Sequence, residues 1–359
     1  MPPILIYNTS SKETVLLSLA IDYLRKKGFS FTVFSRVVND RKNGKPFLPH
    51  SLPIVLIFLP LWYGLYLGSM LARTIFSNTR TLVCFNWPEK IILTPVAKLC
   101  KWRVIWLELP DTSFPKDFLT KRLISRIARK AEIIVFSAEQ GEEWKKITHQ
   151  KSVLHITSPF AYPSALVHQD DLFQALAERP RHRFVIAAVL EGLEKELIER
   201  LLSALAIGLT VCSTLELMII GDGERRKQLL WLIRKMGLDN HVWLVGGSKN
   251  FLRWLGHVDM FVLPHEKPSL EEIATTILVM NQAIPVLGNQ GVGLGEVITS
   301  KTGALIDMTD SETLARQFLR LEQAGDLRKS IGRAAKEQAE KLTFEHFVEI
   351  FSRILSEKL

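Results

Sequence analysis

Two carboxylates directly follow a short apolar run in the first half of the chain. The run Val104–Leu107 is typical of a buried strand, and Glu108 and Asp111 come after it. In an open α/β sheet, the carboxyl ends of the strands border the crevice in which such sheets bind ligands. We therefore name Glu108 and Asp111 as candidate catalytic residues, with an ordinary role as loop carboxylates as the alternative.

Other catalytic and metal-binding patterns are absent from the sequence. The nine histidines form no H-E-x-x-H pattern, and neither G-x-S-x-G nor a phosphate-binding Walker A loop occurs. The three cysteines are scattered and form no C-x-x-C, which argues against a disulfide framework or a zinc site. A glycine triplet lacks the strand and turn that precede a dinucleotide fingerprint, so we assign it to backbone geometry; it consists of Gly291, Gly293 and Gly295.

The elements that must position these residues alternate along the chain, as in parallel sheets covered by helices. A length of 359 residues suggests about two domains, and a proline-containing stretch at 159–182 is typical of a linker. Strands are expected at 4–7, 31–34, 81–85, 104–107, 133–136, 184–189, 216–220, 242–245, 260–263 and 284–287. Helices are expected at 11–27, 117–130, 194–205, 224–236 and 270–280.

The excess of positive over negative charge lies entirely in the first half of the chain. Residues 1–150 hold 22 Lys and Arg against 11 Asp and Glu, whereas residues 151–359 hold 24 against 26. Such asymmetry indicates a polyanionic partner for the first half, either nucleic acid or an anionic membrane surface. Because Trp62, Tyr63 and Tyr66 lie in an uncharged run rather than among basic residues, we favour a membrane over nucleic acid.

That uncharged run, Ser51–Ala72, is 22 residues long. By length and polarity it satisfies the rule for a membrane-spanning helix. Prolines and glycines interrupt it, so a buried core element and a face that enters the bilayer interface are alternatives. The predicted helix 117–130 is basic and amphipathic, and it is either a sheet-covering helix with a solvated cationic face or a membrane-surface helix. The start of the chain has no pattern typical of a signal peptide.

A series of short signals runs through the second half in a recognisable order. A strand ends in Gly221-Asp222-Gly223, a later strand closes on Gly246, and Val258–Pro264 ends at a proline. Ala283–Val286 follows, and then Gly291–Ile298 leads to Lys301–Ile306. In this order and spacing, the second half resembles the C-terminal domain of GT-B glycosyltransferases, most closely the retaining group 1 family. The first half resembles that family only in layout.

The resemblance implies an α/β protein of the GT-B class, with two Rossmann-like domains facing a central cleft. Residues 1–165 would form an N-terminal domain for the acceptor and the membrane, and residues 166–342 a C-terminal domain for a nucleotide-sugar donor. A last helix at 343–359 would cross back to the first domain. Neither a metal ion nor another cofactor would be required.

The donor site departs from the family pattern. The family places an arginine after its strand and a lysine soon after, but here the arginine position is Ala188, and Lys195 aligns with the lysine only after a shift. The family also has two glutamates eight residues apart, which here would fall at Leu270 and Leu278. We assign donor binding to Lys195, Gly246, Glu271, Glu272 and Thr275. A capping box formed by Ser269 and Glu272 is the structural alternative.

On the acceptor side, the resemblance points to the polar segment after the first strand. Asn8 and Lys12 are the candidate acceptor-binding residues, and Thr9 or Ser10 would cap the following helix. The first hypothesis is a transferase that moves a sugar to a lipid-linked or membrane-proximal acceptor at the cytoplasmic face of a membrane, as a peripheral protein. A catalytically silent GT-B partner of an active transferase is the second, and a polyanion-binding protein is the third.

Overall fold

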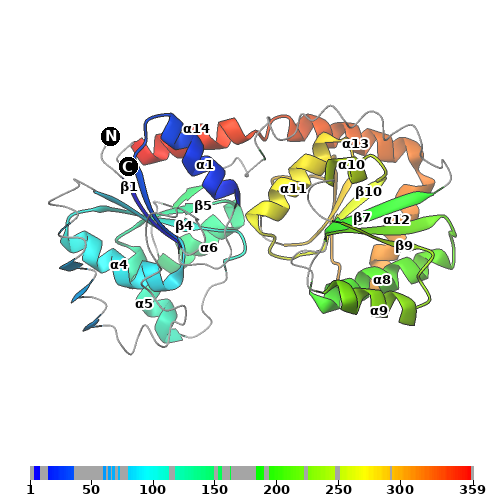
Figure 1. The fold of residues 1–359 in the computed structure, drawn as a ribbon, viewed down its shortest axis with the longest axis horizontal. Coiled ribbons are helices and arrows are strands. Elements are labelled where there is room, and N and C mark those ends of the chain that lie inside the picture. Colours follow the sequence, from blue (N-terminus) through cyan, green and yellow to red (C-terminus); the bar gives the residue numbers. More distant parts are fainter. Residues whose placement is uncertain are drawn as a thin grey trace. The chain divides into compact units, whose positions relative to one another are not determined.

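The computed structural model describes most of the chain, and the statements below concern that part. The described residues are 4–8, 15–35, 60–61, 64–65, 67–68, 72, 80–112, 118–148, 153–155, 162, 183–189, 194–221, 225–246, 251–291 and 293–356. They fold into two compact units, each built on one parallel sheet (Figure 1). The first unit comprises residues 1–158, 269–271 and 345–359, and the second comprises residues 159–268 and 272–344.

The first unit contains a six-stranded parallel sheet in the order β2-β1-β3-β4-β5-β6. Its strands are β1 (Ile4–Asn8), β2 (Phe31–Ser35), β3 (Thr81–Cys84), β4 (Arg103–Glu108), β5 (Glu132–Val135) and β6 (Val153–His155). Its helices are α1 (Val15–Lys26), α4 (Trp87–Leu99), α5 (Phe118–Ala128), α6 (Ala138–Thr148) and α14 (Phe344–Ser356). In Figure 1, α1 and α14 cover one face of this sheet, while α4 and α5 cover the other.

Helix α14 docks on the first unit through an aromatic face. Phe344, Phe347 and Phe351 recur at helical spacing and are almost completely buried. The ring of Phe347 lies 6.2 Å from the ring of Phe136, which follows β5. The guanidinium of Arg103 donates hydrogen bonds to the last carbonyls of α14. The C-terminal helix is therefore part of the first unit, although more than 180 residues separate it in sequence from the end of β6.

The second unit contains another six-stranded parallel sheet, in the order β12-β11-β10-β7-β8-β9. Its strands are β7 (Phe184–Val189), β8 (Leu215–Ile220), β9 (Val242–Val245), β10 (Met260–Leu263), β11 (Val286–Asn289) and β12 (Gly303–Ile306). Its helices are α8 (Lys195–Leu209), α9 (Arg226–Lys235), α10 (Phe251–Leu255), α11 (Leu270–Asn281), α12 (Ser311–Gln323) and α13 (Gly325–Ala339).

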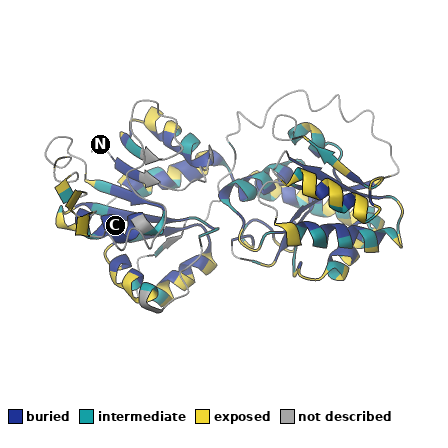
Figure 2. Ribbon diagram, turned by 60° about the horizontal axis from the view of Figure 1, so that its bottom comes forward, coloured by how far each residue is buried: buried dark blue, intermediate teal, exposed yellow. Residues whose placement is uncertain are grey.

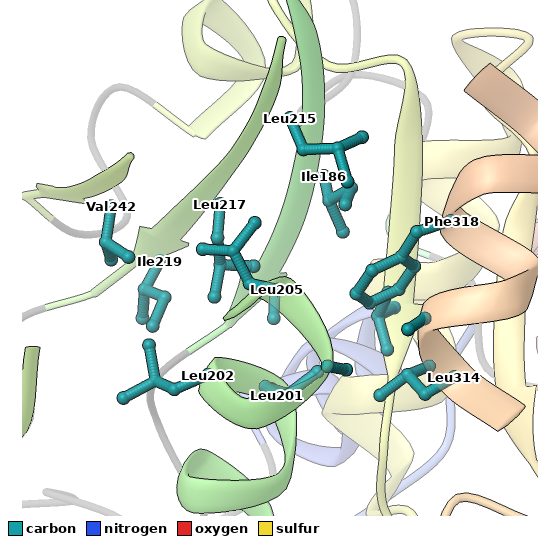
Figure 3. Packing of buried hydrophobic residues seen from close by; sticks show 14 of the residues in the cluster. Ile186, Leu201, Leu202, Leu205, Leu215, Leu217, Ile219, Val242, Leu314 and Phe318 are labelled. Atoms are coloured by element: carbon teal, nitrogen blue, oxygen red, sulfur yellow. The ribbon is translucent and has the colours of Figure 1, made fainter. Parts of the chain in front are cut away.

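Alternation along β7 divides the core of the second unit into two layers. Ile186 and Ala188 face a layer formed with α8, α9 and α12, whereas Val185 and Ala187 face a layer formed with α10, α11 and α13. Figure 3 shows Leu201 and Leu205 of α8 and Phe318 of α12 pointing toward the first of these faces. Both sheets are therefore buried on both faces, as their nearly continuous apolar strands predict (Figure 2).

The expected elements match the structure closely where the apolar signal is strongest. The bounds predicted for β7, β9 and β10 are those observed, and the other predicted strands differ by at most two residues at either end. The predicted helix 194–205 is longer in the structure and ends at Leu209. Several elements had not been predicted: α4, α6, α10, α12, α13, β6 and β12.

The uncharged run 51–72 lies mostly outside the described residues. Those of its residues that are described have helical backbone, and all of them except the half-buried Leu67 are exposed, including the large apolar side chains of Leu61 and Leu65. Within the described part of the chain, no helix combines the length and the apolar character needed to cross a bilayer. The three alternatives for this run, a spanning, a buried and an interfacial segment, all stay predictions.

Candidate functional site

The second sheet has a point at which its strand order reverses. β7 is the first strand of the unit, and the chain adds β8 and β9 on one side of it and then β10, β11 and β12 on the other. Because all pairings are parallel, the carboxyl ends of all six strands meet at one edge. In open α/β sheets, ligands bind at this edge in the crevice at the reversal point, here between β7 and β10.

A histidine and a glutamate form a close pair beside that point. His265 comes two residues after the end of β10, and Glu272 lies in the first turn of α11. His265 Nδ1 is 2.7 Å from Glu272 Oε1, and the two side chains are 15% and 17% exposed. A carboxylate at this distance stabilises the protonated form of an imidazole. The pair thus places a largely buried imidazole, in contact with Glu272, at the edge where a ligand is expected.

The loop that carries His265 is held by contacts from the neighbouring strand. Asn289, the buried last residue of β11, donates from Nδ2 to the carbonyl of Pro264 at 2.9 Å and accepts from the backbone N–H of Met308 at 3.2 Å. Gly291 approaches the same loop so closely that an added Cβ would lie 2.0 Å from the Glu266 carbonyl oxygen. The position of His265 is therefore fixed by backbone packing as well as by Glu272.

The predicted donor-site residues lie at this edge but follow different strands. Lys195 is the first residue of α8, its side chain is 66% exposed, and its Nζ is 3.4 Å from Glu199 Oε1. Gly246 directly follows β9 and is exposed. Glu271, Glu272 and Thr275 lie on the first half of α11 and are half-buried. Of these residues, the structure pairs Glu272 with His265, and the donor assignments stay predictions.

Ala188 lies where the family resemblance expects an arginine. The residue is completely buried in β7 and packs in the layer of α8, α9 and α12. A methyl group at this place offers neither charge nor a hydrogen-bond donor to a phosphate.

In the first unit, Glu108 is the last residue of β4 and is completely buried. Its Oε1 accepts a hydrogen bond of 2.6 Å from the ammonium of Lys90 in α4, while its buried Oε2 has no hydrogen-bond partner among the described residues. Burial raises the pKa of the Glu108 carboxyl, and the Lys90 charge opposes that rise. Because solvent does not reach Glu108, the structure supports a role in holding α4 against β4, and its catalytic role stays a prediction.

The remaining predicted residues of the first unit are placed only in part. Asp111 is half-buried in the turn after β4. Asn8 ends β1, and the strand order of the first sheet reverses between β1 and β3, so its backbone lies at the ligand-binding edge of that sheet. Lys12, Thr9 and Ser10 lie outside the described residues.

Sequence reasoning missed His265, Asn289 and Lys90. For His265 a signal exists, because a histidine that closely follows a buried parallel strand lies at the ligand-binding edge. For Asn289 and Lys90 the signal is weak, since their partners are far apart in sequence. No group of three or more His, Cys, Asp or Glu that could hold a metal ion occurs among the residues that the structure describes.

Comparison with known proteins identifies the second half. Residues 170–338 match the family model of the group 1 glycosyl transferases. The chain is 27% identical over 123 residues to N-acetyl-alpha-D-glucosaminyl L-malate synthase of Bacillus anthracis, a match that covers 34% of this chain and 32% of that protein. It is 36% identical over 72 residues to an uncharacterized glycosyltransferase, MJ1059, of Methanocaldococcus jannaschii, covering 20% of this chain. The matches span only 32% and 17% of the lengths of these two relatives.

Solved structures share the fold of the whole chain. A glycosyltransferase of Rickettsia africae superposes with a TM-score of 0.76 at 14% identity and covers 99% of each chain. Anabaena Alr3699/HepE in complex with UDP and glucose gives a TM-score of 0.70 at 16% identity, also over 99% of each chain. The protein therefore has the GT-B fold, with two Rossmann-like units. Within it, the match to the group 1 glycosyl transferase model covers residues 170–338.

Proposed function

We propose that the protein is a glycosyltransferase that moves a sugar from a nucleotide-sugar to an acceptor. One observation carries the proposal: the family match covers the whole sheet of the second unit, including the reversal point at which such sheets bind ligands. The donor would bind at that edge. No metal ion or other cofactor would be needed, because placing donor and acceptor together and stabilising the leaving diphosphate would supply the rate enhancement.

For the acceptor, we propose a lipid-linked or membrane-proximal molecule at the cytoplasmic face of a membrane. The excess of basic residues in the first half supports a peripheral contact with anionic lipid. Helix α5 adds to this support, because it contains no acidic residue and buries Ile124 and Ile127 while its cations are exposed. These exposed cations are Lys121, Arg122 and Arg126, followed by Arg129 and Lys130 after its end.

A second candidate function is a catalytically silent GT-B protein that binds and regulates an active transferase. Buried Ala188 favours it, since this position of β7 has no cation for the donor diphosphate. Leu270 and Leu278, where the resemblance expects glutamates, favour it as well.

Donor binding separates the two candidates. We would measure the melting temperature of the full-length protein with UDP-, GDP- and ADP-sugars, with and without detergent micelles. A ligand at 100 times its Kd adds about 2.7 kcal/mol of stability, which gives a clear shift. A rise selective for one nucleotide, followed by acceptor-dependent release of its nucleoside diphosphate, supports the transferase. A well-folded protein that responds to none supports the silent partner.

The Lys195→Ala variant tests the predicted donor residue. Because the Lys195 ammonium is largely exposed and its carboxylate partner is one helical turn away, we expect the variant to fold normally. Loss of the ligand-induced melting shift would place Lys195 in the donor site. An unchanged shift would remove Lys195 from it.

A further inference from the structure

UDP-, GDP- and ADP-sugars carry a diphosphate, and a protein that binds one of them must compensate its negative charge. Proteins do this with cationic side chains and with N–H groups at helix starts. In the second unit, the edge at which we place the donor includes the beginning of α11, but that helix has two carboxylates, Glu271 and Glu272, in its first turn. Two carboxylates at a helix start repel a phosphate, so compensation must come from a nearby cation.

Among the described cations at this edge, Arg226 and Lys195 are poorly suited to the task. The guanidinium of Arg226 donates to the carbonyl of Gly221 at 3.2 Å and to that of Leu244 at 3.0 Å, and these bonds tie it to β8 and β9. Lys195 is 66% exposed, so water screens its charge. A charged side chain that is largely buried interacts more strongly with a ligand, because less water surrounds the two charges and screens them.

His265 meets the requirement better. It lies directly at the reversal point between β10 and β7, and its side chain is only 15% exposed. Glu272 at 2.7 Å favours the imidazolium, and the imidazolium in turn neutralises one of the two carboxylates of α11. Among the described residues, the charged groups next to this pair in sequence are Glu271 on α11 and the exposed Glu266 and Lys267 on the loop of His265 itself.

The loop geometry suits a binding residue that must not move. The bond from Asn289 to Pro264 fixes the residue before His265, and the close approach of Gly291 fixes the backbone of the residue after it. A fixed cation loses little conformational entropy when a ligand arrives, so more of its interaction energy becomes affinity.

We infer that His265, oriented by Glu272, is the residue that compensates the diphosphate charge of the donor. The inference rests on the proposed function, and it assigns the task to a residue outside the family positions that Ala188 and Lys195 occupy. It also gives a reason why buried Ala188 is compatible with donor binding.

The test compares donor binding by matched variants of the full-length protein. His265→Gln keeps a hydrogen-bonding side chain without charge, and His265→Lys keeps a cation. His241→Gln is the control, because His241 lies at the opposite edge of the same sheet with Nδ1 3.1 Å from the carbonyl oxygen of Leu215. Isothermal titration calorimetry with UDP, GDP, ADP and their glucose and mannose conjugates gives each Kd.

We expect His265→Gln to weaken binding of the diphosphate ligands by about ten- to hundredfold, the range for one charge-assisted hydrogen bond. His265→Lys should retain affinity within about tenfold of the wild type, and His241→Gln should leave it unchanged. The wild-type Kd should also rise more steeply with added salt than that of His265→Gln. The imidazole nitrogen NMR signals of His265 in the wild type, which should shift on ligand addition, provide a readout that no folding defect can mimic.

Two failures are distinguishable. If the wild type binds a nucleotide-sugar and His265→Gln binds it equally well, with no shift of the imidazole signals, the inference is wrong and the proposed function stands. If the well-folded wild type binds no member of the panel, the proposed function is overturned and this inference with it.

Discussion

At the scale of single residues, two of the completely buried charged side chains of the first unit form an ion pair. The Lys90 ammonium and the Glu108 carboxylate are at most 1% exposed. The ammonium also lies 4.9 Å from the ring centroid of Trp87 and 5.9 Å from that of Trp106, whose indole N–H donates to Thr94. Taking two charges out of water is expensive, and each partner is tolerated only because the other is present.

Removing one partner should therefore cost more than removing both. We expect Lys90→Met to lower the free energy of unfolding of the first unit by about 3–5 kcal/mol, because it leaves a buried carboxylate without its cation. Urea unfolding followed by tryptophan fluorescence measures this, since Trp87, Trp102, Trp106 and Trp144 all report on this unit.

The double variant Lys90→Met/Glu108→Leu should recover part of the lost stability. Asp22→Ala, which breaks the exposed pair with Arg25 at 3.1 Å, is the control and should change little. Equal losses in the single and double variants would show that packing, rather than charge, dominates at this place.

At the scale of elements, α14 shows how a distant segment completes a unit. Arg103, at the start of β4, donates to the carbonyls of Ile354 at 2.8 Å and Leu355 at 3.2 Å, and its Nε donates to Glu132 at 2.9 Å. A guanidinium at the last turn of a helix satisfies carbonyls that lack intrahelical partners and complements the helix dipole. The aromatic face of α14 supplies the apolar contact.

Phe347→Ala should destabilise the first unit even though the residue lies near the end of the chain. The side chain is completely buried, and truncation of a buried phenylalanine typically costs about 3–5 kcal/mol. Tryptophan fluorescence in urea should show an earlier transition of the first unit. Glu349→Ala on the exposed face of the same helix should leave the transition in place, and an equal effect of both variants would refute docking through the aromatic face.

The start of α12 offers a prediction about pH. Hydrogen bonds from the Thr313 hydroxyl and from the backbone N–H groups of Glu312 and Thr313 lower the pKa of the Asp310 carboxyl. A carboxyl whose pKa is lower in the folded state contributes stability above its unfolded pKa, and this contribution is lost as the pH falls through the folded pKa. Lowering the pH should therefore reduce the folding stability of the second unit, in part because Asp310 takes up a proton.

Asp310→Asn should reduce that acid sensitivity. Asparagine is as good an N-cap as aspartate but does not titrate. The melting temperature of the second unit should therefore fall less in this variant between about pH 6 and pH 3, the range in which carboxylates take up protons. Asp239→Asn, an exposed charge of the same unit, is the control. Identical acid profiles of wild type and Asp310→Asn would show that the cap does not contribute.

At the scale of the whole molecule, the sequence predicted ten of the twelve observed strands, because buried strands of a parallel sheet read as apolar runs, and it missed the edge strands β6 and β12. Helix α4 escaped prediction since it is buried on nearly every side and contains Pro95, which leaves no amphipathic pattern. Helix α12 does have an amphipathic pattern, because Leu314, Phe318 and Leu321 recur at helical spacing, and this pattern would have predicted it.

The site was less predictable than the fold, for a physical reason. The edge of the second sheet followed from the order of strands, but the side-chain contacts described in the two units join residues that only the tertiary packing brings together. Asn289 and Pro264 are 25 residues apart, and Lys90 and Glu108 are 18 apart. Contacts between residues this far apart in sequence produce no local periodicity, so the sequence alone does not mark them.

The charge asymmetry of the chain leads to a prediction about membranes. If the cations of α5 contact anionic lipid, each should contribute about 1 kcal/mol near the surface. The triple variant Lys121→Gln/Arg122→Gln/Arg126→Gln should then weaken binding to phosphatidylserine-containing vesicles by about a hundredfold in a sedimentation assay.

All three side chains are exposed, so the variant should fold. Lys227→Gln/Arg234→Gln/Lys235→Gln removes as many exposed charges from α9 of the second unit and should bind as the wild type does. An equal loss in both triple variants would mean that net charge alone drives adsorption, and no loss in either would exclude α5 as the membrane contact.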